Sequence, residues 1–485
     1  MAKSPRHRGA GVTPHIVDLQ AFHALVSERS RTMMKIATAC SACRESDFSL
    51  TGPLLALIHA EATQLEELLD AYGARTNRAW HSFRSHVAGL KNFADAGHEL
   101  LHLDHSVSGY HIACADSTFH DDTRTVIDYV ARTVLYTVRE WYAEACSLGL
   151  NRVAEGFCVS DFAEDLPLGR LPHDRRAIQR STDAYRVVDL ATQLLHGTER
   201  ARFLKNVVNT PSSERLALVG SVISEENLRG LESRFHSLQS LYDTHLSDSD
   251  TERADADLRS LRGHISAVLH LMRTGTVFVH FYERHIVPNQ ETFPCMAAGN
   301  PFGENGLLDV LVDYCLGYTW RFLLDARQTC REVLGCYAEV GAIDLPVPAF
   351  HGFHVRPSTL VALIVQHYGS DVTIACGAVT YNAAIPMELF RANEWINQKK
   401  RERVYAAIDA LPLADIESRA THVREAVREA LIRLAAQKVI TIHEHPLPLE
   451  FIGNGNGPLF QDQLQAAVER LLRDHAINVD VDITV

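Results

Sequence analysis

The sequence predicts a multidomain protein in which a large all-α region is followed by a C-terminal α+β domain with an antiparallel sheet. From residue 15 to residue 340, apolar residues recur every three to four positions, which is the spacing of amphipathic helices. After Gly341 the pattern changes to short alternating segments separated by turn residues, which is typical of strands and hairpins. The 485 residues allow about three domains. A hydrophobic content of 46% and a charged content of 22% exclude a disordered or collagen-like chain.

The helical region begins after a basic arm, residues 1–14, which lacks the apolar core of a secretory signal and is expected to be disordered. The expected helices span 16–44, 51–73, 76–104, 120–148, 174–207, 212–245, 250–285 and 306–340. The segment 166–172 (LPLGRLP) could divide this region into two subdomains. No apolar run approaches the roughly 18 residues of a membrane-spanning helix. We therefore expect a cytoplasmic protein. Its ten cysteines are too sparse for a disulfide scaffold.

The C-terminal domain, residues 341–485, is expected to combine short strands with amphipathic helices. The expected strands are 343–347, two within 371–384 that turn at Gly377, 439–443 and 477–485. The expected helices are 358–368, 386–395 and 460–474, with a two-helix insertion at about 391–437. Because strands joined by hairpins dominate over βαβ units, we expect the sheet to be antiparallel.

The clearest chemistry lies in the tract 350–358 (FHGFHVRPS), between an expected strand and an expected helix. A helix N-terminus leaves backbone N–H groups without partners and carries about half a positive charge, so it favours a phosphoryl group. His354 lies just ahead of that terminus, and Arg356 can add charge-assisted hydrogen bonds. Pro357 removes no donor that the first helical turn needs. Since a neutral imidazole is a competent nucleophile near pH 7, the tract predicts phosphoryl transfer on His354.

This tract resembles the active-site sequence Gly-Leu-His-Ala-Arg-Pro-Ala of the histidine-containing phosphocarrier (HPr) family. The resemblance runs without a gap from Gly352 through the expected helix and hairpin to Leu389, and 439–443 and 460–474 match the last strand and helix of the family. It implies an HPr-like open-faced sandwich as the fold. It also implies that His354 accepts a phosphoryl group that an enzyme I-type donor draws from phosphoenolpyruvate, and that Arg356 stabilises it.

The resemblance implies roles for the neighbouring residues as well. The residues expected to support the phosphoryl group are His351, Pro357, Ser358 and Thr359, and those expected to dock donor and acceptor proteins are Ile385, Pro386 and Met387. His351, where the family often has asparagine, could instead pack. Ile385 occupies the position of the family's regulatory serine, so we expect no kinase control of the usual type. No cofactor is expected.

An alternative reading concerns His98, Glu99 and His102, which match the motif His-Glu-x-x-His. In that motif two histidines one turn apart bind zinc and the glutamate activates water, so the helical region could be a metal-dependent hydrolase. The longer zinc-protease patterns fail, because His105 and Ser108 stand where these patterns need a glycine and a third ligand. With 26 histidines in the chain, the short motif arises readily by chance. Histidines on a helix surface are the simpler interpretation.

Other patterns have a weaker chemical context. Glu99 and His102 are half of a di-iron ligand set, and His98, His102 and His105 share a helical stripe where a haem or metal could bind. The remaining patterns are the pair Cys40 and Cys43, the His-Asp pairs at 120–121 and 173–174, and the histidines at 264, 270, 280 and 285. The cysteine pair and the last four histidines are expected to be core residues, and the His-Asp pairs are expected to begin helices.

Three functions follow from these patterns. The favoured one is a phosphocarrier or phosphorylation-dependent regulatory protein that acts through His354, with the helical region as a partner or sensor module. The alternatives are a metal-dependent hydrolase at residues 98–102, and a non-catalytic interaction scaffold with a degenerate HPr-like domain. The formal net charge is −13, whereas proteins that bind nucleic acid ordinarily carry excess positive charge, so nucleic acid is not an expected partner.

Overall fold

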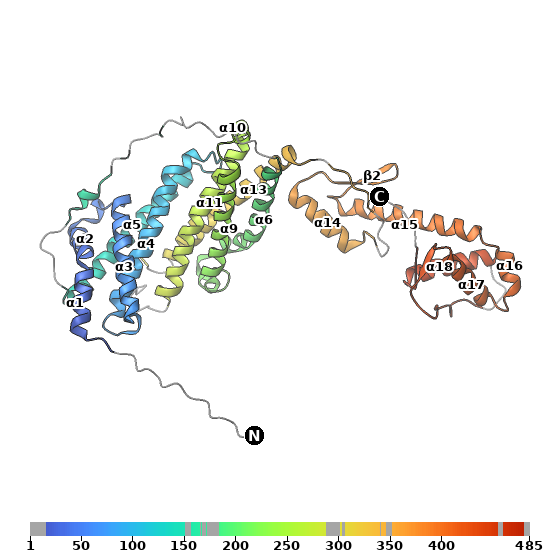
Figure 1. Ribbon diagram of the computed structural model, residues 1–485, viewed down its shortest axis with the longest axis horizontal. Helices are drawn as coiled ribbons and strands as arrows, with labels where there is room; N and C mark the ends of the chain where they lie inside the picture. The colour runs from blue at the N-terminus through green and yellow to red at the C-terminus, as the bar shows by residue number, and fades with distance from the viewer. Residues whose placement is uncertain are drawn as a thin grey trace, which may run out of the picture. The chain divides into compact units, whose positions relative to one another are not determined.

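The computed structural model describes residues 16–150, 157–164, 166, 171, 184–287, 301–302, 306–339, 341–345, 352–453 and 459–479. The chain forms two compact units, Met1–Tyr337 and Ala338–Val485 (Figure 1). The division between the units lies close to Gly341, where the sequence pattern changes from helical to mixed.

The first unit is built from helices. The longer ones are α1 (Leu19–Arg29), α2 (Arg31–Ala42), α3 (Gly52–Ala71), α4 (His81–Ser106), α5 (Ser117–Ser147), α6 (Ala184–Arg200), α9 (Glu225–His245), α11 (Ala256–Phe281) and α13 (Gly317–Tyr337). The shorter ones are α7 (Leu204–Val208), α8 (Ser212–Arg215), α10 (Asp250–Ala254) and α12 (Gly306–Asp309), and two π-helical segments span Tyr282–Ile286 and Val310–Leu316. The described residues of this unit therefore agree with the expected all-α region, although several boundaries differ.

Side-chain caps determine where several of these helices begin. Thr51 Oγ1 accepts the N–H of Leu54 at the start of α3, and Asp116 Oδ1 accepts the N–H of Phe119 at the start of α5. Such bonds satisfy N–H groups that have no acceptor inside the helix. Asp255 caps α11 in the same way, which is why the single helix expected over 250–285 is divided into α10 and α11.

Helices α4 and α11 lie at the centre of the first unit. Helix α4 packs against α3, α5 and α11, and α11 also packs against α9 and α13 (Figure 1). The ring of Phe93 on α4 lies 4.9 Å from the ring of Phe281 on α11, measured between centroids. Both helices also bury polar side chains, including Glu99 and His264. Polar groups buried in this way need partners inside the protein.

The second unit contains both helices and strands. Its elements are α14 (Val355–Tyr368), β1 (Thr373–Cys376), β2 (Val379–Asn382), α15 (Pro386–Asp409), α16 (Leu413–Arg419), α17 (Val423–Ala436), β3 (Ile440–Ile442), α18 (Phe460–Arg473) and β4 (Ile477–Val479). Helix α14 begins three residues earlier than expected and ends at Gly369, which adopts the left-handed conformation with φ +67°. Glycine is the residue that adopts this helix-ending conformation most readily.

The expected HPr-like open-faced sandwich with its antiparallel sheet is wrong. The described strands form two separate two-stranded antiparallel sheets, one of β1 and β2 and the other of β3 and β4. Helix α15 accounts for the separation, because it continues without a break through the start of the expected insertion. Its first half buries Leu389, Ala392 and Ile396 beside the hairpin, and its second half buries Val404 and Ile408 in another core.

Two further expected strands are only partly described. Residues 343–345 are exposed and belong to no strand, and the rest of the expected strand 343–347 lies outside the described residues. The last expected strand, 477–485, is described only as far as residue 479. No described helix combines the length and apolar character needed to cross a membrane.

Candidate functional site

His354, the predicted phosphoryl acceptor, is the exposed N-cap residue of α14. Its backbone carbonyl accepts the N–H of Ser358 at 3.0 Å, which forms the first hydrogen bond of the helix. The N–H groups of Val355 and Arg356 belong to the first turn, where helix geometry supplies no acceptor. The first turn contains no acidic residue, and Arg356 is exposed. The partial positive charge of the helix end therefore lies next to His354, and Arg356 follows two residues later in the same turn.

A tight loop fixes the backbone ahead of His354. The N–H of Phe353 donates to Asn393 Oδ1 on α15 at 2.9 Å, and Gly352 has a φ of +55°. A Cβ atom on Gly352 would lie 2.0 Å from the same Asn393 Oδ1. Both the left-handed conformation and this close approach require glycine. His351, which precedes this loop, lies outside the described residues.

The other residues expected to support a phosphoryl group have partners in the backbone. Ser358 is fully buried, and its hydroxyl donates to the carbonyl of Phe353 at 2.9 Å. The hydroxyl of Thr359 donates to the carbonyl of Val355 at 2.8 Å. Pro357 is half-buried in the first turn. The two hydroxyls therefore stabilise the first turn of α14, and His354 lies at the start of this turn.

Apolar side chains are exposed on the elements that follow His354. Among the predicted docking residues, Ile385 is 44% exposed and Met387 is 62% exposed, whereas Pro386 is half-buried at the start of α15. Helix α14 adds three exposed residues that were not predicted from the sequence: Leu360, Leu363 and Ile364. Their spacing of three and four residues places them on one face of the helix.

The motif at residues 98–102 does not form a zinc site of the expected kind. Glu99 Oε2 lies 2.6 Å from Nδ1 of His270, and Glu99 Oε1 lies 3.0 Å from Nη1 of Arg273. Burial alone would raise the pKa of Glu99, but the hydrogen bond from His270 and the charges around it lower this pKa below its ordinary value. The Glu99 carboxylate is therefore bound by two residues of α11. Among the described residues, His98, Glu99 and His102 do not meet as a group of three metal ligands.

A cleft of about 540 Å³ opens beside His102 and His270. Its other charged groups have partners of their own. Glu252 accepts the hydroxyl of Tyr242 at 2.8 Å, Arg259 donates to the carbonyl of Glu252 at 2.7 Å, and Arg262 donates to Ser266 at 3.0 Å. These bonds tie α9, α10 and α11 together.

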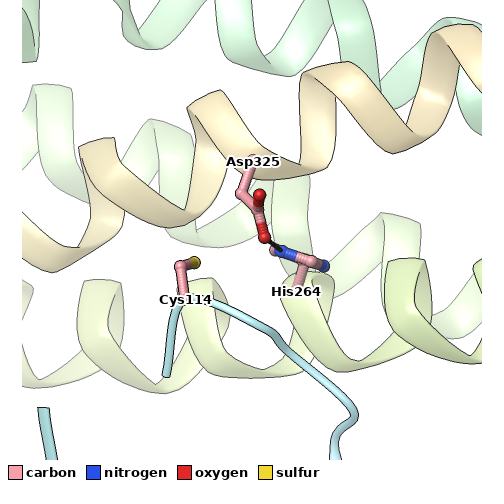
Figure 2. Close-up of side chains that lie close together, drawn as sticks. All are labelled: Cys114, His264 and Asp325. Atoms are coloured by element: carbon pink, nitrogen blue, oxygen red, sulfur yellow. Dashed lines mark hydrogen bonds and ion pairs between the residues drawn. The ribbon is translucent and has the colours of Figure 1, made fainter. Parts of the chain in front are cut away.

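Three residues from distant parts of the chain converge elsewhere in the first unit (Figure 2). Cys114 lies in the loop before α5, His264 on α11 and Asp325 on α13, and one ligand atom from each lies within 4.8 Å of the others. His264 is 1% exposed, and its Nε2 lies 2.9 Å from Asp325 Oδ2. Its Nδ1 lies 2.7 Å from the carbonyl oxygen of Ser260. Burial, followed by the charge of Asp325 and a hydrogen bond to it, raises the pKa of the Cys114 thiol to about 12.

Close backbone packing brings the Cys114 loop to His264. A Cβ atom on Gly263 would lie 2.0 Å from the carbonyl oxygen of Tyr110, so only glycine allows this loop to lie directly against α11. His264 was expected to be a core histidine, and neither Cys114 nor Asp325 was predicted as a site residue. No short motif marks this group, because its members come from three separate segments.

The remaining candidates have structural roles. Cys40 is buried, burial raises its pKa to about 12, and both Cys40 and Cys43 are free thiols. His120 lies 3.6 Å from Asp104, and His280 lies 2.9 Å from Glu225, and both contacts join two helices. The His-Asp pair at 173–174 lies outside the described residues.

No family model matches this chain, and no curated protein or solved structure matches it either. The two sites that stand out are therefore defined by their own geometry. One is the exposed imidazole at the N-terminus of α14, and the other is the group of Cys114, His264 and Asp325.

Proposed function

We propose that this protein is a phosphoryl carrier or a phosphorylation-dependent regulatory protein, and that His354 accepts the phosphoryl group. The observation that carries the proposal is the exposed His354 at the N-cap of α14, with Arg356 exposed in the same first turn. Such a helix end stabilises a dianionic group through free N–H groups and the helix dipole. The proposal concerns the chemistry of this turn and does not depend on an HPr-like sheet.

The transfer step is an exchange at phosphorus between two nitrogens. The phosphohistidine of an enzyme I-type donor loses its N–P bond, a new N–P bond forms to a ring nitrogen of His354, and the imidazole of the donor leaves. The charge on the phosphoryl oxygens is balanced by Arg356 and by the N–H groups of the first turn. In a second exchange, a nucleophile of an acceptor protein forms a new bond to phosphorus, the N–P bond to His354 breaks and the His354 imidazole leaves. Because the donor draws on phosphoenolpyruvate, the proposal locates the chain in the cytoplasm.

Donor and acceptor proteins need a surface on which to dock close to the imidazole. Exposed apolar residues on α14 and at the start of α15 supply such a surface, namely Leu360, Leu363, Ile364, Ile385 and Met387. Exposed apolar side chains on one face of a helix, as on α14, are typical of protein interaction sites. The hydrolase alternative has less support, because Glu99 is bound to His270 and Arg273 and is not poised to activate water.

The test is phosphorylation of the full chain by phosphoenolpyruvate and an enzyme I. We expect one acid-labile phosphoryl group per chain, detected by intact mass, and its complete loss in His354→Ala. His367→Ala, which alters a histidine on the same helix, is the matched control and should be labelled like the wild type. Arg356→Ala should slow labelling about tenfold, which corresponds to the loss of one charge-assisted hydrogen bond.

Two results would refute this proposal. A folded wild-type chain that takes up no phosphoryl group would favour the interaction scaffold. Labelling that persists in His354→Ala would show that another histidine is the acceptor.

A further inference from the structure

We propose that Cys114, His264 and Asp325 bind a divalent transition metal ion of the zinc class, with a fourth coordination position open to solvent. This site lies in the helical unit and is independent of the function proposed for His354. Three features point to a metal ion: the hydrogen bonds of His264, the convergence of three donor atoms, and the chemical types of these atoms.

The contacts of His264 place two atoms that can both act as acceptors, its Nε2 and Asp325 Oδ2, 2.9 Å apart. The carbonyl oxygen of Ser260 can only accept, so Nδ1, at 2.7 Å, carries the ring hydrogen. In a neutral ring, Nε2 then presents a lone pair to Asp325 Oδ2, which is also an acceptor, at 2.9 Å. Either a proton, carried by the ring or by the carboxyl group, or a bound cation must lie between them. A metal ion satisfies both lone pairs and leaves the deeply buried ring neutral.

The presence of the Cys114 sulfur favours a bound metal ion over a proton shared by His264 and Asp325. A proton shared by His264 and Asp325 needs no third group, whereas a thiol here completes a set of three ligands within 4.8 Å. Tetrahedral bonds of about 2.0 to 2.3 Å place donor atoms about 3.5 Å apart. Since Cys114 is only half-buried and the Asp325 side chain is 38% exposed, small rotations of these two side chains bring the sulfur closer and widen the 2.9 Å separation of His264 Nε2 and Asp325 Oδ2 to this distance.

The surroundings have the features of a metal centre. A metal-binding histidine ordinarily donates its other ring N–H to a carbonyl or carboxylate, which orients the ring, and Ser260 provides that carbonyl. Sulfur, nitrogen and carboxylate donors together select zinc-class ions over magnesium or calcium, which prefer oxygen. A thiolate and a carboxylate also balance a charge of +2. Three protein ligands, one of which is the partly exposed carboxylate of Asp325, leave one tetrahedral position for water.

Cobalt titration of the full-length protein, after removal of metals with a chelator, tests the proposal. We expect one Co²⁺ bound per chain, the intense visible spectrum of a tetrahedral ion and a near-ultraviolet band from thiolate-to-cobalt charge transfer. Zinc should displace the cobalt and abolish both signals. Cys114→Ala should remove the charge-transfer band and weaken binding at least about tenfold.

Two further variants make the outcome decisive. Asp325→Asn should weaken binding while it keeps the charge-transfer band, because the thiolate remains. Cys146→Ala, which removes another half-buried thiol of the same unit, should bind cobalt like the wild type. Circular dichroism establishes that each variant is folded. A folded wild type that binds no cobalt, or a charge-transfer band that survives in Cys114→Ala, would overturn the proposal.

Discussion

Buried imidazoles determine how the first unit responds to acid. His86 on α4 is 4% exposed and His285 is 5% exposed. Burial lowers the pKa of His86 from 6.5 to about 4. Burial, with nearby positive charges, lowers the pKa of His285 to about 3. Both rings are therefore neutral in the folded state at pH values where they are protonated in the unfolded chain.

This difference predicts that acid destabilises the protein well above the pH at which carboxylates titrate. Below pH 6.5 the unfolded chain binds a proton at His86 and the folded chain does not, so stability falls with pH until the folded pKa is reached. For His86 the loss between pH 7 and pH 5 is about 2 kcal/mol of unfolding free energy. Denaturant titrations at the two pH values measure it. His86→Leu should reduce the loss by about that amount.

The matched control for that experiment is His105→Leu, which alters an exposed histidine on the same helix. It should leave the difference between pH 7 and pH 5 unchanged. An equal pH dependence in wild type and His86→Leu would show that His86 does not titrate differently on unfolding.

At the scale of elements, one arginine joins the short helix α8 to the segment that precedes α13. Arg215 is 7% exposed, and its guanidinium contacts Asp309 at 2.7 Å and Asp313 at 2.5 Å. Its Nε also donates to the carbonyl of Thr210 at 3.2 Å. Helix α8 has only four residues and cannot be stable alone. These bonds therefore hold it in place.

We expect Arg215→Ala to lower the free energy of unfolding by about 2 kcal/mol, because hydrogen bonds to charged groups are lost in a largely buried setting. Urea denaturation measures the change. Arg202→Ala removes an exposed ion pair with Glu199 and should cost less than about 0.5 kcal/mol. Equal effects of the two substitutions would contradict a special role for Arg215.

At the scale of the whole molecule, the chain is two units with separate cores. The second unit, Ala338–Val485, contains a core shared by α15, α16, α17, α18 and the sheet of β3 and β4. It also contains smaller clusters between α14, the β1–β2 hairpin and the first half of α15. Helix α15 thus contributes to all three of these clusters among the described residues of the unit.

Separate expression of Met1–Tyr337 and Ala338–Val485 should therefore give two folded proteins, each with a cooperative thermal transition followed by circular dichroism. A fragment of residues 338–397, which cuts α15 and removes the second core, should lack such a transition. Failure of Ala338–Val485 to unfold cooperatively would show that it depends on the first unit.

Much of this architecture can be predicted from local pattern. Apolar spacing predicts the long helices, and the turn at Gly377 predicts the β1–β2 hairpin. The predicted sheet arrangement was wrong because strand pairing depends on which segments meet in the folded chain. The alternation of residues within one strand does not indicate which strand pairs with it. The helix expected over 386–395 continues to Asp409 in the structure. Its two halves are buried in two different cores, and the sequence pattern alone does not separate these cores.

The sequence by itself determined the helical first region, the change of pattern near Gly341 and the placement of His354 at the start of a helix, because these features depend on residues close together in the chain. Only the tertiary structure decided that β3 pairs with β4 and that Glu99 is bound by His270. It alone brought Cys114 to His264 and Asp325. Each of those depends on packing between distant segments, such as the contact of Tyr110 with Gly263, which leaves no periodic signal in the sequence.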